Sequence, residues 1–515
     1  MAVKMESARR TLAGAVLACG LALAGAMLPV SAALAALEEG APVPAARAIP
    51  VAPVDRDSAV GRIVLGFAEG LEKHFGSGSN AVRLALDAPM WAEERDDAVI
   101  VHLPGAHLVD LADPSPQWTF GDLSVAITPR NDTTYDFEAA LPPVIERPNQ
   151  RLKISEGTVS GTWRSDLELT TKFEADATDL QLLELRGTSA VLEASLASLA
   201  ATETLVQEAD GLWKGRSALS LSDLKSEGLL MGKLDVTSSV DGIDGDLIMA
   251  MHGSLGWLMV LKSGPEALPR RLAPLISAPW GRSDIVVAVD DLTVTGDDWG
   301  LAGNDKFVLG RLFWRTDFDD RGAHADVATK MALVELMVSG ATAGDIPPGL
   351  IPHAITVDVA LERLPFRQIV EALSGPTKPG NSSQPDLVIP SDVLLGQMDA
   401  ADTSFALREL YIAAPSFELI ADGAVNVESA SLFGVIGRIE ARIRGVDRLM
   451  ELAVKEGEED MVALLIVLQG LGRPVFNEGA DEPFYAYEID LRRDGAVTVN
   501  GIPFDMLLQG GLSPQ

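Results

Sequence analysis

The segment Asp166–Leu185, DLELTTKFEADATDLQLLEL, alternates apolar and polar residues with little interruption. Successive side chains of a β-strand point to opposite faces, so alternate positions share one face. One face carries Leu167, Leu169 and Phe173, and the other carries charged residues and threonines. The pattern predicts a strand from Leu167 to Thr178 that is roughly 40 Å long at ~3.3 Å per residue. A strand about twice the usual length constrains the fold more than any other feature of the chain.

The same two-residue period dominates the chain from about residue 95 to residue 362. It recurs in DLSVAIT, KLDVTSSV and ITVDVAL, and turn sequences rich in Asp and Gly, such as DGIDGD and DFDDRG, separate segments of this kind. Helical patterns are few. The sequence therefore predicts a mostly β, β-rich α+β fold, with large twisted antiparallel sheets of long strands and a few peripheral helices. The apolar face of such a sheet needs a second sheet, a helix layer or a ligand to cover it.

Two local signals mark the ends of the β-rich part. The segment SAVGRIVLGFAEGLEKHFG predicts an amphipathic helix with Ser58 as its N-cap and Gly76 as its end. Near the C-terminus, YAYEIDLRRDGAVTVNGIPF predicts a β-hairpin, because Asp494-Gly495 is a turn sequence between two alternating runs.

The start of the chain has the pattern of an export signal. Lys4, Arg9 and Arg10 are followed by residues 11–37, which carry no charge. Small residues then offer a site for signal peptidase, with cleavage before Ala36. The residues of this predicted site are Ala33, Ala35 and Ala36. The sequence therefore predicts export, most simply to the periplasm.

Two other interpretations of this leader stay open. The apolar run is long enough to remain in the inner membrane as an uncleaved anchor. The residues VLAC also loosely resemble a lipoprotein signal with Cys19 as the acylated residue, although the sequence after Cys19 stays hydrophobic. The predicted organisation of the chain is a signal peptide at 1–35, an Ala/Pro-rich linker at 36–57, a β-rich region with an N-terminal helix at 58–373, a loop at 374–387, and a C-terminal β-rich region at 388–515 with a helical segment at 446–472.

Charge and cysteine content exclude several classes of function. The net charge of −33 repels nucleic acid and anionic lipid headgroups at long range. Cys19 is the single cysteine, so a chain without its leader has no thiol for a disulfide, a cysteine-ligated metal or a cysteine nucleophile. A hydrophobic core has to hold the fold instead.

A search for catalytic or metal-binding patterns is negative. The chain contains no G-x-S-x-G elbow, no phosphate-binding P-loop and no H-E-x-x-H motif. His102 and His107 flank a Pro-Gly turn signal, which favours turn-flanking histidines over a metal pair. Asp-rich turns lack the spacing of a calcium loop. The sequence predicts no catalytic residue, no cofactor and no metal ligand, and it favours a protein that is not an enzyme.

The C-terminal third resembles a known family. The segments PSFELIADGAVNVE, GRIEARIRGVDRLMELAVKEG and YEIDLRRDGAVTVNGIPF, in this order, are similar to the bacterial envelope family known as domain of unknown function 2125. The resemblance implies an exported or membrane-anchored, β-rich envelope protein, distantly similar to AsmA-like proteins that are thought to carry lipid along an apolar groove. It implies no catalytic residues.

Three hypotheses follow for the function. The first is a non-enzymatic cell-envelope protein that contacts lipid or another amphiphile through the apolar face of a long sheet, including Leu167, Leu169 and Phe173. The second is a periplasmic scaffold or assembly factor that binds other envelope proteins through strand edges or its acidic surface. The third is a hydrolase that uses a pair of carboxylates. Nucleic acid is not an expected partner.

Overall fold

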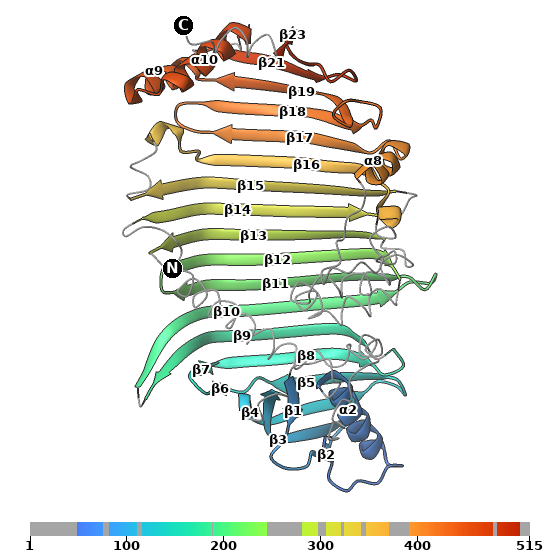
Figure 1. Cartoon of the computed structure of the whole chain (residues 1–515). Helices are drawn as coiled ribbons and strands as arrows, with labels where there is room; N and C mark the ends of the chain where they lie inside the picture. The colour runs from blue at the N-terminus through green and yellow to red at the C-terminus, as the bar shows by residue number, and fades with distance from the viewer. Residues whose placement is uncertain are drawn as a thin grey trace, which may run out of the picture. The chain divides into compact units, whose positions relative to one another are not determined.

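The computed structural model describes residues 49–75, 82–110, 116–167, 169–187, 189–244, 281–296, 305–320, 324–340, 347–369, 391–476 and 482–504 (Figure 1). The chain divides into two compact units, unit 1 (Met1–Gly264) and unit 2 (Pro265–Gln515). Strands make up 63% of the structure and helices 15%, which confirms the mostly β fold. The predicted signal peptide, with Ala33, Ala35 and Ala36, and the predicted loop at 374–387 lie outside the described residues.

Unit 1 is built mainly from long antiparallel strands. Within the described residues its elements are α2 (Ala59–Phe75), β1 (Val82–Ala85), β2 (Trp91–Arg95), β3 (Ala98–Asp110), β4 (Pro116–Pro129), β5 (Thr134–Ala140), β6 (Val144–Arg147), β7 (Gln150–Lys153), β8 (Glu156–Arg164), β9 (Leu169–Arg186), β10 (Ser189–Gln207), β11 (Trp213–Ser226) and β12 (Leu229–Ile243). From β8 to β12, each strand pairs with the next one in the sequence (Figure 1). This meander is the predicted sheet of long strands.

Unit 2 repeats the meander. Its described elements are β13 (Arg282–Thr295), β14 (Lys306–Asp319), β15 (Ala325–Ser339), η3 (Pro348–Leu350), β16 (Ala354–Leu364), α8 (Ser391–Ala400), β17 (Ser404–Ala413), β18 (Glu418–Val427), β19 (Val435–Arg444), α9 (Val446–Glu456), α10 (Glu459–Leu471), β20 (Arg473–Val475), β21 (Phe484–Leu491), β22 (Val497–Val499) and β23 (Ile502–Pro503). Strands β13 to β19 pair in sequence order, and β19 then pairs with β21. The predicted hairpin is confirmed by the pairing of β21 with β22 around Asp494-Gly495.

The N-terminal helix forms where its signals predict it. Ser58 caps α2, because its Oγ accepts a hydrogen bond from the amide of Gly61 at 2.9 Å. Val64 and Leu71 face a core shared with β1 to β4 and are 1% and 2% exposed. The end of the segment expected to be a linker is also attached to this core. Ile49 is buried there, and the amide of Ala52 donates to the carbonyl of Met90 at 2.8 Å.

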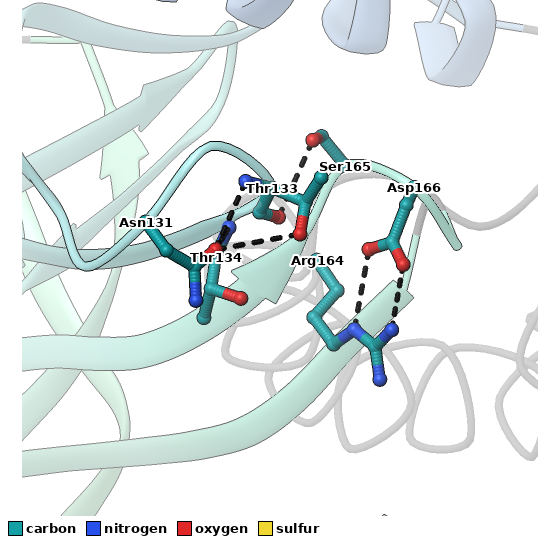
Figure 2. Close-up of polar contacts among 6 residues, drawn as sticks. All are labelled: Asn131, Thr133, Thr134, Arg164, Ser165 and Asp166. Carbon is teal, nitrogen blue, oxygen red and sulfur yellow. Dashed lines mark hydrogen bonds and ion pairs between the residues drawn. The ribbon is translucent and has the colours of Figure 1, made fainter.

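Strand β9 begins at Leu169, two residues later than the sequence predicts, because a turn occupies the residues before it. Figure 2 shows how this turn is held: Arg164 donates two hydrogen bonds to the carboxylate of Asp166, at 2.6 and 3.2 Å. These bonds lower the pKa of Asp166 below its usual range. The amide of Ser165 donates to the carbonyl of Thr133 at 2.8 Å. Leu167 therefore lies in a turn and not on the apolar face of the strand.

Several long strands contain one acidic residue with a left-handed backbone. In β9 the buried residues Phe173 and Ala177 are odd-numbered, whereas Leu180 and Leu182, also buried, are even-numbered. The change of phase falls at Asp179, whose φ is 50°. A left-handed residue interrupts the two-residue repeat, and Asp tolerates this conformation better than most residues. The corresponding residues of other strands are Asp223 in β11, Asp291 in β13 and Glu335 in β15.

Replacement of Asp179 by Val tests this role. A β-branched residue is strained at positive φ, so we expect the free energy of unfolding to fall by about 1–2 kcal/mol, measured by urea denaturation. Asp179→Gly should cost little, because glycine adopts positive φ without strain. Asp176→Val, on the exposed face of the same strand, is the control. Equal losses in Asp176→Val and Asp179→Val would contradict the assignment.

Helices α9 and α10 pack on the edge of the sheet in unit 2. Val446, Ala453 and Leu465 form a small buried core with Tyr485 and neighbouring side chains. Tyr487 in β21 is 4% exposed, and its hydroxyl donates to the carbonyl of Leu468 in α10 at 3.0 Å. Burial raises the pKa of Tyr487 to about 12. The strand and the helix are thereby joined by a buried phenol that is neutral in the fold.

This pKa predicts a loss of stability in alkali. The tyrosine of the unfolded chain ionises near pH ~10, whereas Tyr487 in the fold ionises at about 12, so the folded chain holds its proton more tightly. The stabilisation is complete below pH ~10 and is lost as the pH rises through about 12. We expect Tyr487→Phe to flatten the dependence of the free energy of unfolding on pH in this window. An unchanged profile in the variant would rule out this source of the pH dependence.

Candidate binding surface

The register of unit 2 aligns apolar side chains in rows that cross its strands. Val287, Trp314, Met331, Val357 and Leu410 are direct partners in β13 to β17. Direct partners share a face of the sheet, and positions two residues away continue the same face. Three neighbouring rows share this face, and the first contains Phe318, Val327, Leu361, Phe405 and Val425. The second row contains Ile285, Thr316, Thr329, Val359, Leu407 and Ile439. The third row contains Val289, Leu312, Leu333, Ile355, Ile412, Leu419 and Ile443. We call these four rows the apolar face.

The apolar face is accessible to solvent. None of its side chains is fully buried, and Ile285, Trp314 and Phe405 are 44%, 41% and 47% exposed. Seven strands ~4.8 Å apart and four rows ~6.6 Å apart give an area of about 600 Å². This estimate reaches the upper end of the range for the largest apolar patch on a typical soluble monomer, where such patches mark interaction sites.

Its polar groups do not weaken its apolar character. Thr316 and Thr329 are opposite each other in β14 and β15, and their hydroxyls hydrogen-bond to each other at 3.1 Å. A hydroxyl that is satisfied within the sheet does not have to bind water. The pair therefore lowers the cost of covering this row with an apolar ligand, because one of its two hydroxyl donors is bonded within the sheet.

The opposite face of the same strands is charged and paired. Lys330 in β15 lies 2.9 Å from Glu409 in β17 and 3.5 Å from Asp358 in β16. The hydrogen bond with Glu409 raises the pKa of Lys330 above its usual value. Arg315 makes two hydrogen bonds to Asp317, at 2.7 and 2.8 Å. Strands β14 to β17 thus have one face with ion-paired side chains and one apolar face.

The predicted apolar face of unit 1 has a different environment. Leu169 and Phe173 share a face of β9, as the alternation predicts, but they are 1% and 0% exposed. Leu167 is part of the preceding turn. Phe173 lies beside Gly161 of β8, where a Cβ atom would meet the ring of Phe137 at 2.6 Å. These residues belong to the core and do not offer an open surface.

The histidines singled out in the sequence do not come together on a metal. His102 stacks on Trp91, with ring centroids 3.9 Å apart, and its Nδ1 lies 2.9 Å from the hydroxyl of Ser124. The Nδ1 of His107 lies 2.7 Å from the carbonyl of Gly105 in the same strand. In the part of the chain that the structure describes, no three His, Cys, Asp or Glu side chains are placed to hold a metal ion.

Part of the accessible face is visible in the sequence, although the predicted apolar face lies on β9. The run ITVDVAL places Ile355, Val357, Val359 and Leu361 on one face, and all four belong to the apolar face. The same alternation occurs in buried β9. Exposure depends on what packs over a strand, and alternation carries no signal of it.

A comparison with known protein families, curated proteins and solved structures finds no match to the chain. The resemblance of the C-terminal third to the envelope family stays a prediction. Across the described ranges, no helix combines the length and the apolar character required to cross a membrane.

Removal of the Lys330 ammonium tests the pairing on the charged face. Lys330→Met leaves Asp358 and Glu409 without their shared cation, and we expect the free energy of unfolding to fall by about 0.5–1 kcal/mol. The loss should shrink at 1 M salt, because screening weakens both the attraction and the remaining repulsion. Lys306→Met, at the exposed start of β14, is the control. A loss that does not depend on salt would point to packing and not to charge.

Proposed function

We propose that this protein is a non-enzymatic, exported cell-envelope protein whose apolar face binds lipid or another amphiphile. One observation carries the proposal: four rows of mainly apolar side chains, which between them cover β13 to β19, stay accessible, while charged side chains on the other face of β14 to β17 are ion-paired. Water is a poor solvent for such a surface, and a ligand with hydrocarbon chains would remove it from water.

The size of the surface supports acyl chains as the ligand. Four rows extend ~20 Å along the strands, and an acyl chain in one leaflet reaches about half of the ~30 Å hydrocarbon core of a bilayer. Covering about 300 Å² at ~25 cal/mol per Å² contributes about 7 kcal/mol before the costs of association. One or two chains on this surface would therefore be enough for measurable binding.

The charged face supports the same conclusion by contrast. Asp358 and Glu409 are held in ion pairs around Lys330, which is the arrangement expected of carboxylates that stabilise the sheet. No described pair of carboxylates is singled out as acid and nucleophile, so a hydrolase gains no support. A scaffold that binds envelope proteins is the alternative outcome of the experiments below.

The first test is the lipid content of the purified protein. We expect the mature chain, Ala36–Gln515, to carry lipid at near one molecule per chain after purification without detergent, measured by solvent extraction and mass spectrometry. Met331→Glu places a charge in the middle of the apolar face and should lose the lipid. Val334→Glu, on the same strand but beside Arg311 on the charged face, is the matched control. A lipid-free protein, or equal loss in both variants, would contradict the proposal and favour a scaffold.

A second test uses Trp314, which lies on the apolar face and is 41% exposed. A brominated fatty acid quenches tryptophan fluorescence only at contact, so part of the emission should fall as it binds. We expect this quenched fraction to disappear in Trp314→Phe, while the affinity measured by equilibrium dialysis stays within a few-fold. Quenching that persists unchanged in Trp314→Phe would place the ligand elsewhere.

A further inference from the structure

A turn at one end of unit 2 exposes two large apolar side chains. Leu432 and Phe433, in the connection between β18 and β19, are 74% and 58% exposed. Figure 1 shows this connection at the same end of the strands as α8 and the turn between β21 and β22. Two adjacent apolar side chains that are this exposed make a candidate contact site for a partner.

Hydrogen bonds hold the backbone of this turn. The amide of Glu428 donates to the carbonyl of Gly434 at 2.9 Å, and the amide of Gly434 donates to the carbonyl of Ser431 at 3.2 Å. Ser429 is bound to the carboxylate of Asp399 in α8 through both its amide and its hydroxyl. These amides are satisfied inside the protein and do not depend on water.

The turn between β21 and β22 supports it from the side. The amide of Leu432 donates to the carbonyl of Arg493 at 3.2 Å, and a Cβ atom on Gly495 would meet the side chain of Leu432 at 2.4 Å. Arg493 is paired with Glu428 at 2.9 Å. Within the described residues Arg492 makes no ion pair, and it is exposed. The turn that contacts Leu432 therefore carries an exposed cation.

The turn also continues the apolar face. Val427 and Val435, which flank it, are direct partners. Val427 follows Val425 of the apolar face by two residues, so it lies on the same side of the sheet. The exposed pair Leu432 and Phe433 is thus located where the apolar face reaches the end of its strands.

We propose that Leu432 and Phe433 insert into the surface of a lipid bilayer, where a lipid can pass from the membrane onto the apolar face. This inference rests on the proposed function and adds the source of the ligand. Three features favour a bilayer over a protein partner. Leu432 and Phe433 are exposed in one short connection, most amides of that connection (Glu428, Ser429, Ser431, Leu432 and Gly434) are bonded inside the protein, which lowers the cost of entering hydrocarbon, and the neighbouring turn carries an exposed cation, Arg492, that suits headgroup phosphates.

The net charge of the chain predicts an unusual lipid dependence. A charge of −33 repels an anionic membrane, so attachment has to come from the apolar side chains. We expect binding to phosphatidylcholine vesicles that does not weaken at high salt. Vesicles with anionic lipid should bind less at low salt and recover as screening increases.

Sedimentation with sucrose-loaded phosphatidylcholine vesicles tests the proposal on the mature chain. We expect Leu432→Ser with Phe433→Ser to lower the partition coefficient about tenfold or more, because the variant loses the two apolar side chains that the bilayer would bury. Val206→Ser with Leu230→Ser removes two side chains of unit 1 that are 61% and 49% exposed, and is the matched control. Thermal unfolding should show that all proteins are folded.

The outcomes separate this inference from the proposed function. The turn variant should keep the binding of a monomeric brominated fatty acid, seen by quenching of Trp314, while Met331→Glu should lose that binding and still sediment with vesicles. The inference would be overturned if the wild-type chain did not sediment with vesicles, or if the turn variant and its control lost sedimentation equally. The proposed function would then still be tested by the extraction of bound lipid. Loss of fatty acid in Met331→Glu without any change in sedimentation supports both.

Discussion

The antiparallel register is the constraint on which the rest of this structure depends. Hydrogen bonding between neighbouring strands makes direct partners share a face, so a slip of one residue in any strand would move its apolar residues to the charged side. In the long strands, a left-handed residue marks the point where the apolar positions change between odd and even residue numbers. Asp291 and Glu335, in β13 and β15, lie at the level of Gly310 in β14, and the apolar positions change from odd to even, or the reverse, at this level.

The two units use the same pattern with different results. In unit 1 the alternating residues of β9 form part of a core, and Phe173 is fully buried. Helix α2 packs on a separate core that it shares with β1 to β4. In unit 2 the alternation of β14 to β17 produces a surface, with Trp314 exposed in its middle. A sheet with one apolar face and one ion-paired face is stable as a layer but has apolar area in contact with water. The proposed lipid binding depends on these two features together, the apolar face and the exposed turn beside it.

Local signals predicted much of the fold because they act over a few residues. The Ser58 cap, the Asp494-Gly495 turn and the helical segment at 446–472 all form as expected. The start of β9 was predicted two residues too early, because Leu167 fits the alternation but the Arg164–Asp166 pair closes a turn there. The change of phase at Asp179 is visible in the sequence as a break in the apolar alternation, and an acidic residue at such a break is a signal for a left-handed residue.

The two-residue period is a property of neighbouring residues, so the long, two-faced strands of this β protein could be predicted from the sequence alone. The sequence also determined that the strands are mainly antiparallel and that Val357 shares a face with Ile355 and Val359. Which of these faces are open to solvent became clear from the packing of the folded chain. Leu169 and Val357 have the same local pattern, yet the first is 1% exposed and the second lies on an accessible surface. Exposure depends on residues distant in the sequence that pack over a face, and no local pattern contains that information.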